Sequence, residues 1–341
     1  MAPQWASVAP QKRAATRMHI RLMARRAEGM TQAKHKESFI DSKVGLVLLA
    51  SACTLLWGSA SPFIKLTYSL FDESSADLPS LLVFAGVRFA LAGLMVVALG
   101  SVSRRKLLLP GRRDMGPICV LALFQTALQY SLDYIGLANT TGTSGSIVEA
   151  TAAFFAILLA ALVFGSERLT ARKLFGCALG FAGVVGITFA GSNEGMGFSL
   201  MGEGLILASC VSAAFSTCFM SRFSQTHDQV LLSGWQFFVG GVTLALLGGA
   251  AGGSMHTCPP AGWAAFAYIA AVSAVAYTLW GTLLKHHPVS SVTVFGFLTP
   301  VFGVILSLAM LGESQSYSPI PLFLSLTLVC VGIQVVNRAT D

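Results

Sequence analysis

Five amide or charged side chains lie inside apolar stretches of the sequence, where such groups are costly. Gln125, Gln129 and Asp133 recur every four residues, a spacing that keeps side chains on one face of a helix. Glu149 lies in the next apolar stretch and Arg88 in an earlier one. A charged group near the bilayer centre costs about 2.5 to 3.5 kcal/mol on insertion scales, so it usually faces a partner, a cavity or a pathway. These residues predict a substrate site inside a helical bundle.

Each of these candidates also has a structural interpretation. The polar stripe could serve hydrogen bonds between helices. Arg88 cannot lose its proton, so it needs an ion pair with Asp133 or Glu149, a row of carbonyls or an anionic ligand. For Glu149 we expect a functional role, because a buried carboxylate can bind a proton or a cationic substrate but not both.

Aromatic and amide residues from other stretches complete the candidate set. Trp57 lies well inside the first apolar stretch, where either helix packing or lining of the site explains it. The second half contributes Gln236, Tyr277 and Trp280 as substrate-binding candidates. No catalytic residue, metal or cofactor is expected, since the seven cysteines are scattered without a metal-ligand spacing.

The elements that must position these residues are long apolar stretches. The chain of 341 residues is 54% hydrophobic and 11% charged, and about 20 apolar residues suffice for a helix to cross a bilayer. The sequence predicts an all-α polytopic membrane protein with ten transmembrane helices, over approximately 44–64, 80–100, 115–137, 143–164, 172–191, 200–220, 230–250, 261–283, 290–311 and 319–337.

Basic residues are concentrated in alternate connections, which predicts both termini in the cytoplasm. This distribution explains the net charge of +7 without a nucleic-acid partner. Residues 1–43 form a basic segment for which two interpretations stay open: a disordered cytoplasmic tail or a targeting segment. The first implies an integral protein of the plasma (inner) membrane, and the second implies an organelle such as a plastid.

An internal repeat divides the apolar part of the chain into two halves, residues 44–191 and 200–337. A shift of 146 residues places Glu167 on Glu313 and Ser144 on Ser290. An odd number of spans in each half inserts the second half upside down, so the sequence predicts two inverted five-helix repeats with a site between them.

With these features the chain resembles the ten-helix EamA-type branch of the drug/metabolite transporter superfamily. The resemblance covers residues 44–337 and is carried by short segments at Trp57-Gly58 with Pro62 and Lys65, at Arg88, at 165–170, at 297–302 and at 311–313. A proline common in the family's fourth span is replaced near Ala153 and Phe154, which predicts a straighter fourth helix here. The family pattern supplies no role for Glu149.

The resemblance implies a secondary carrier, an exporter or exchanger of small organic metabolites or drugs that works by alternating access. Its partners would be a small-molecule substrate and the lipid bilayer, in a monomer or weak homodimer, and transport would be coupled to a proton gradient, coupled to a substrate gradient, or uncoupled. No P-loop is present, so ATP hydrolysis is not expected. A channel or non-transporting scaffold is the main alternative, and an intramembrane enzyme is the weaker one.

Reporter fusions test the predicted topology. Fusions at Glu73 and Glu194 should report the outer side, and a fusion at Arg338 the inner side, because basic connections stay in the cytoplasm. Reversal of any one of the three would overturn the count of ten spans.

Overall fold

The computed structural model describes residues 39–70, 77–137, 139–140, 145, 148–190, 199–255, 259–311 and 319–339. Most of the predicted tail over 1–43 lies outside these ranges, as do Ser144, Glu313 and the side chains of Pro62 and Lys65. The chain divides into two compact units, Met1–Gly45 and Leu46–Asp341. The first unit contains a described 3-10 turn, Phe39–Asp41, and the second contains the helical bundle described below.

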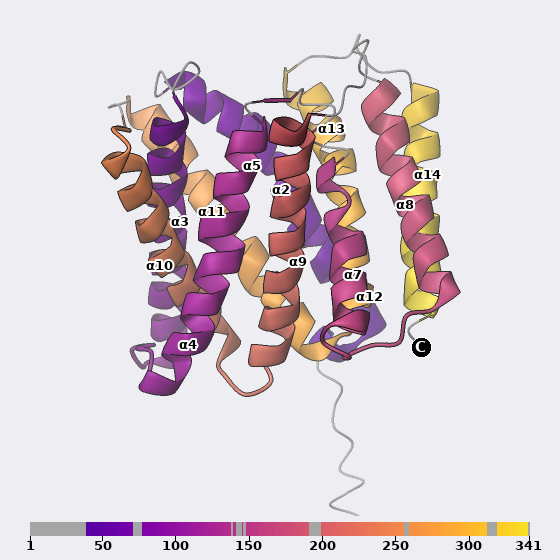
Figure 1. The fold of residues 1–341 in the computed structure, drawn as a ribbon, viewed down its shortest axis with the longest axis horizontal. Coiled ribbons are helices and arrows are strands. Elements are labelled where there is room, and N and C mark those ends of the chain that lie inside the picture. The colour runs from indigo at the N-terminus through magenta and orange to yellow at the C-terminus, as the bar shows by residue number, and fades with distance from the viewer. Residues whose placement is uncertain are drawn as a thin grey trace, which may run out of the picture. The chain divides into compact units, whose positions relative to one another are not determined.

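Every regular element in the described ranges is helical (Figure 1). The first half of the bundle contains α2 (Lys43–Leu70), α3 (Leu78–Arg104), α4 (Arg112–Leu121), a π-helical segment (Ala122–Leu128), α5 (Gln129–Leu137), α7 (Ala152–Leu162) and α8 (Ala171–Ala190). The second half contains a π-helical segment (Leu200–Gly204), α9 (Leu205–Phe223), α10 (Gln229–Ala250), α11 (Pro260–His286), α12 (Val289–Thr293), a 3-10 segment (Val294–Phe297), α13 (Leu298–Leu311) and α14 (Pro319–Arg338).

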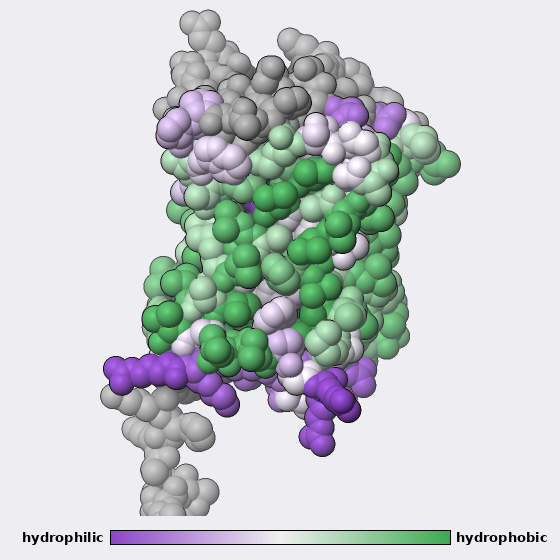
Figure 2. Space-filling model, turned by 90° about the vertical axis from the view of Figure 1, so that its left-hand side faces the viewer, coloured by the Kyte–Doolittle hydropathy of each residue, from purple (hydrophilic) through white to green (hydrophobic). Residues whose placement is uncertain are grey.

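Six helical segments in the described part of the chain are long and apolar enough to cross a membrane: Lys43–Ala60, Leu78–Arg104, Arg112–Leu137, Leu200–Phe223, Gln229–Ala250 and Pro260–His286. Large apolar side chains such as Leu94, Leu99 and Leu246 are exposed on these helices. Figure 2 shows an apolar band between hydrophilic ends on one face of the bundle. Such a band matches the hydrocarbon layer of a bilayer. The ten-span count stays a prediction.

Glycines bring two helix pairs into close backbone contact. A Cβ at Gly86 of α3 would lie 2.3 Å from the backbone nitrogen of Ala245 in α10, and a Cβ at Gly93 would lie 2.4 Å from that of Phe238. On the opposite flank, α8 packs against α14 (Figure 1). There, a Cβ at Gly176 would lie 2.9 Å from the carbonyl oxygen of Gly332. Small residues allow this approach in membranes, so Gly176 lets α8 pack closely against α14.

The fourth apolar stretch is broken, and the prediction of a straighter helix there is wrong. Helical residues end at Glu149, residues 150–151 form a turn, and α7 begins at Ala152. The carbonyl of Val148 accepts hydrogen bonds from the backbone N–H of Thr151 at 2.9 Å and from its hydroxyl at 2.6 Å. Because Thr151 satisfies the freed carbonyl, the helix breaks without a proline.

The ninth apolar stretch is interrupted at a matching place. Between α12 and α13, residues Val294–Phe297 form a 3-10 segment, and Pro300 follows in the first turn of α13. A shift of 146 residues carries the turn at 150–151 to residues 296–297, within this segment. Regular α-helix is therefore interrupted in both stretches at positions that are equivalent in sequence.

Wide helical turns interrupt the third stretch. Residues Ala122–Leu128 are π-helical, and the hydroxyl of Ser212 in α9 donates to the carbonyl of Phe124 in this segment at 2.7 Å. Segments of this kind are rare and frequently mark functional sites. Because Gln125 lies inside the segment and Gln129 begins α5, the regular 100° step assumed for the polar stripe does not hold along its whole length.

The glycine contacts predict a stability difference within α10. Gly241→Ala should destabilise the protein by about 1 to 3 kcal/mol, because the new Cβ overlaps backbone atoms that cannot rotate away; the nearest, the nitrogen of Ala90, would lie 2.3 Å from it. Thermal unfolding in detergent measures this as a lower midpoint. Gly249→Ala in the same helix is the control, since its Cβ would meet nothing within 4 Å. Equal midpoints for the two variants would contradict this account of the packing.

Candidate functional site

Three aromatic rings from α2 and α11 form one wall of the candidate site. The ring of Trp57 lies 4.9 Å from that of Tyr277 and 4.9 Å from that of Trp280. The indole Nε1 of Trp57 is buried and has no hydrogen-bond partner among the described residues. A buried indole N–H usually finds a partner, so this donor is available to a ligand. The structure thus brings together three of the residues predicted to bind substrate.

Arg88 of α3 is buried, with 5% of its surface exposed. Its guanidinium carbon lies 4.5 Å from the centre of the Phe89 ring, and its Nε has no hydrogen-bond partner among the described residues. No ion pair joins Arg88 to Asp133 or Glu149, although all three residues are described. The ion pair considered from the sequence is therefore not formed here. A cation over an aromatic face gains some stabilisation, but its charge stays unneutralised by direct contact.

A pair of tyrosine hydroxyls joins α5 to the aromatic wall on α11. Tyr130 of α5 packs on Phe89 with ring centres 4.4 Å apart, and its hydroxyl lies 2.7 Å from the hydroxyl of Tyr277. Both tyrosines lie within electrostatic range of Arg88. Helices from the two halves of the chain therefore meet at this hydroxyl pair.

The carboxylates lie around the break in the fourth stretch. Glu149 is the last helical residue before the break, and its side chain is exposed. It lies within electrostatic range of Asp133, and both acids lie within range of Tyr277. On the facing helix α9, the Cys210 thiol donates to the carbonyls of Val148 at 3.5 Å and Glu149 at 3.6 Å. These contacts hold the backbone at Glu149 against α9.

The amide residues lie next to this cluster. Gln236 of α10 is buried and accepts a hydrogen bond from the Thr126 hydroxyl at 3.1 Å, while its Nε2 has no partner in the described part of the chain. Gln125 is buried and Gln129 half-buried. Neither forms a hydrogen bond with the other predicted site residues that the structure describes. The polar residues predicted from four-residue spacing to share one helix face thus differ in burial.

Sequence reasoning missed several residues that the structure places in the cluster: Thr126, Tyr130, Ser209 and Cys210. For Tyr130 a signal was present, since a polar residue followed by tyrosine recurs one helical turn apart, at Gln129-Tyr130 and Asp133-Tyr134. Ser209 and Cys210 carried no comparable signal. The Ser209 hydroxyl lies 3.4 Å from Asp133 Oδ1, a contact that only the approach of α9 to α5 creates.

This arrangement can hold a charged organic molecule. It offers one permanent cation, two carboxylates, two hydroxyls and an aromatic wall that can receive an apolar or cationic group. Among the described residues, no group of three or more histidine, cysteine or acidic side chains could hold a metal ion. The charged groups and aromatic rings of this cluster are suited to recognition of charge and shape.

Comparison with known proteins agrees with these features. An "Uncharacterized transporter" of Archaeoglobus fulgidus is 30% identical over 275 residues, 79% of this chain and 90% of that protein. A "Probable terminal-alkyne amino-acid exporter" of Streptantibioticus cattleyicolor is 26% identical over 287 residues, 83% of this chain and 90% of that protein. A solved crystal structure superimposes with a TM-score of 0.71 at 18% identity, covering 88% of this chain and 98% of that one.

The family match covers both halves of the sequence. Residues 44–189 and residues 200–338 each match the EamA-like transporter family. The matched segments contain the helices that are apolar enough to cross a membrane. This chain is therefore a membrane protein that belongs to the EamA-like transporter family.

Proposed function

We propose that the protein is a secondary carrier of small organic solutes with a cationic or zwitterionic group, and that it binds them at the cluster of Arg88, Asp133 and Glu149. The observation that carries this proposal is the unpaired state of Arg88. A buried arginine inside a membrane helix is costly unless a partner neutralises it, and among the described residues no ion pair, with Asp133, Glu149 or any other acid, neutralises Arg88. An anionic group of the substrate would complete the cluster.

Equivalent contacts support an inverted repeat around this site. Gly86 and Gly93 of α3 lie 148 residues before Gly234 and Gly241 of α10, and the close approaches pair Gly86 with Gly241 and Gly93 with Gly234. This exchange of partners is what a two-fold axis between the second and seventh spans produces. Together with the matching breaks in the fourth and ninth stretches, it supports alternating access by movement of similar halves.

Charge at the helix ends supports an orientation with both termini inside. The basic residues Arg104, Arg222, Lys285 and Arg338 lie at or near the ends of α3, α9, α11 and α14. Side-chain contacts join several of these ends, for example the Gln225 amide to the Lys285 carbonyl at 2.8 Å. Basic ends stay in the cytoplasm. The exporter name of one relative supports outward movement of substrate across the plasma membrane.

Glu149 is the group that would couple transport to a proton. Glu149 adjoins a helix break, and its carboxylate lies within electrostatic range of Asp133. Two acids that interact in this way cannot both stay ionised without cost, so a proton and a cationic group compete for them. Competition for one group is the simplest basis for exchange of a proton against substrate.

Transport in proteoliposomes tests this coupling. Glu149→Gln removes the charge and keeps the shape, so the variant should lose uptake driven by a pH gradient while substrate counterflow persists. A panel of labelled amines and amino acids with and without the gradient gives the measurement. Asp77→Asn is the matched control, because Asp77 is an exposed cap of α3 and asparagine caps a helix equally well.

Two outcomes would contradict the proposal. Unchanged pH dependence in a folded Glu149→Gln variant would remove the proton-coupling role. Substrate flux in the wild type without acceleration by unlabelled substrate on the opposite side would indicate a channel instead of a carrier.

Replacement of Arg88 separates a substrate contact from a structural ion pair. Arg88→Gln should raise KM for substrates with an anionic group by about 10- to 100-fold, the range expected for loss of a charge-assisted hydrogen bond. The folded yield should change little, because Arg88 forms no ion pair with either acid in the structure. The comparison is made with a cationic substrate that lacks the anionic group.

A loss of folded protein in Arg88→Gln that Asp133→Asn restores would show a structural ion pair and would contradict this assignment. An equal KM change for both substrates would contradict recognition of the anionic group.

A further inference from the structure

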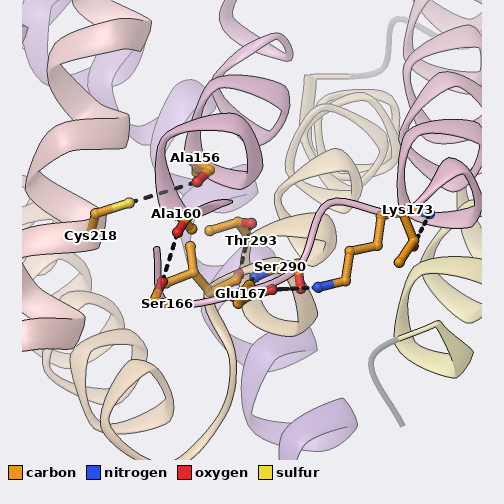
Figure 3. Close-up of polar contacts among 10 residues, drawn as sticks. Ala156, Ala160, Ser166, Glu167, Lys173, Cys218, Ser290 and Thr293 are labelled. Carbon is orange, nitrogen blue, oxygen red and sulfur yellow. Dashed lines mark hydrogen bonds and ion pairs between the residues drawn. The ribbon is translucent and has the colours of Figure 1, made fainter. Parts of the chain in front are cut away.

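A buried polar cluster joins the two halves at the basic end of the bundle. Glu167, in the connection before α8, accepts a hydrogen bond from the backbone N–H of Ser290 at 2.9 Å and another from the Ser290 hydroxyl. The ammonium group of Lys173 in α8 lies 2.6 Å from the same carboxylate. Figure 3 shows Glu167 between Ser290 and Lys173. Charge-assisted hydrogen bonds of this kind are among the strong ones.

Burial distinguishes this cluster from the other charged links at this end. The side chains of Glu167 and Lys173 are 7% and 4% exposed, and Ser290 is fully buried. By contrast, the ion pair between Arg104 and Asp228, which also joins the two halves, has 43% and 36% of its side chains exposed. Exposed pairs contribute little, whereas removal of one member of a buried pair is costly.

The cluster holds the short segment that precedes a helix break. Ser290 belongs to α12, whose five residues are all buried and which ends at the 3-10 segment Val294–Phe297. Helix α12 also packs against α7, which follows the break in the fourth stretch. Hydrogen bonds to Glu167 therefore hold the beginning of α12 at Ser290, and the 3-10 segment follows its other end.

We propose that Glu167 is a latch that keeps the basic end of the carrier closed. In this state Glu167 holds α12 through Ser290, and Lys173 neutralises the carboxylate. Release of Ser290 lets α12 turn about Val294–Phe297 and separates it from α7, which opens the central site towards the basic end. The inference rests on the proposed function in one respect, since it assumes that the carrier alternates between states.

A native cysteine reports this opening without any transport measurement. Cys218 of α9 is buried, and its thiol donates to the carbonyl of Ala156 in α7 at 3.7 Å (Figure 3). Separation of the helices at this end would expose the thiol to a water-soluble maleimide. Labelling of the same protein after unfolding in detergent gives the reference for complete reaction of the thiol.

The experiment measures maleimide labelling of Cys218 in full-length protein in nanodiscs, resolved by peptide mass spectrometry. Glu167→Gln should accelerate Cys218 labelling about tenfold or more relative to the wild type, because an amide cannot form an ion pair with Lys173 and the closed state loses population. Ser290→Ala should give a smaller acceleration, since it removes the hydroxyl donor and leaves the backbone N–H. Arg104→Gln is the matched control and should leave the rate within twofold.

Unchanged Cys218 labelling in folded Glu167→Gln overturns the latch and leaves the proposed transport function untouched. Equal acceleration by Arg104→Gln also overturns it, because any weakened contact at this end would then suffice. Where Glu167→Gln gives no folded protein, Ser290→Ala decides: faster labelling supports the latch and an unchanged rate rejects it. Loss of transport with a normal labelling response would instead count against the proposed function alone.

Discussion

The constraint on which this structure depends is that backbone polar groups inside a membrane must find partners within the protein. The fourth stretch breaks after Glu149 because Thr151 and Cys210 satisfy the carbonyls that the break releases. Without these donors, a regular helix would be the only stable form. The same break leaves the Glu149 side chain exposed beside Asp133. Local backbone chemistry thus determines where the charged group of the site lies.

Close glycine packing complements these breaks. Helix α3 is held against α10 and α8 against α14 by backbone approaches too tight for a Cβ atom, and such contacts resist sliding because interiors are close-packed. The short segments α7 and α12 contain no glycine, so neither contributes an approach of this kind. Movement between states is therefore expected in the interrupted helices, while the glycine-paired helices act as stable flanks.

The sequence predicts the helical class well because apolar length and loop charge are local properties. The break at Thr151 could not be predicted in the same way, since it depends on a thiol of α9 that approaches only after folding. The absence of a proline near Phe154 led to the wrong prediction of a straighter helix. The hydroxyl of Thr151, directly before α7, donates to a freed carbonyl and so stabilises the break without a proline. Likewise, spacing placed Arg88 in the membrane but gave no distance to an acid, so the orientation over Phe89 was not foreseeable.

Charge balance at the site links recognition to coupling. Arg88 keeps its charge at all relevant pH values, whereas Asp133 and Glu149 can each be neutral or ionised. With both acids ionised the three residues carry a net negative charge, and a cationic group or a proton restores neutrality. A zwitterion adds no net charge: its anionic group would pair with Arg88 and its cationic group with an acid. In the proposed carrier, the cationic group of a substrate and a proton would therefore compete for the two acids, while Arg88 would distinguish a zwitterion from a simple cation.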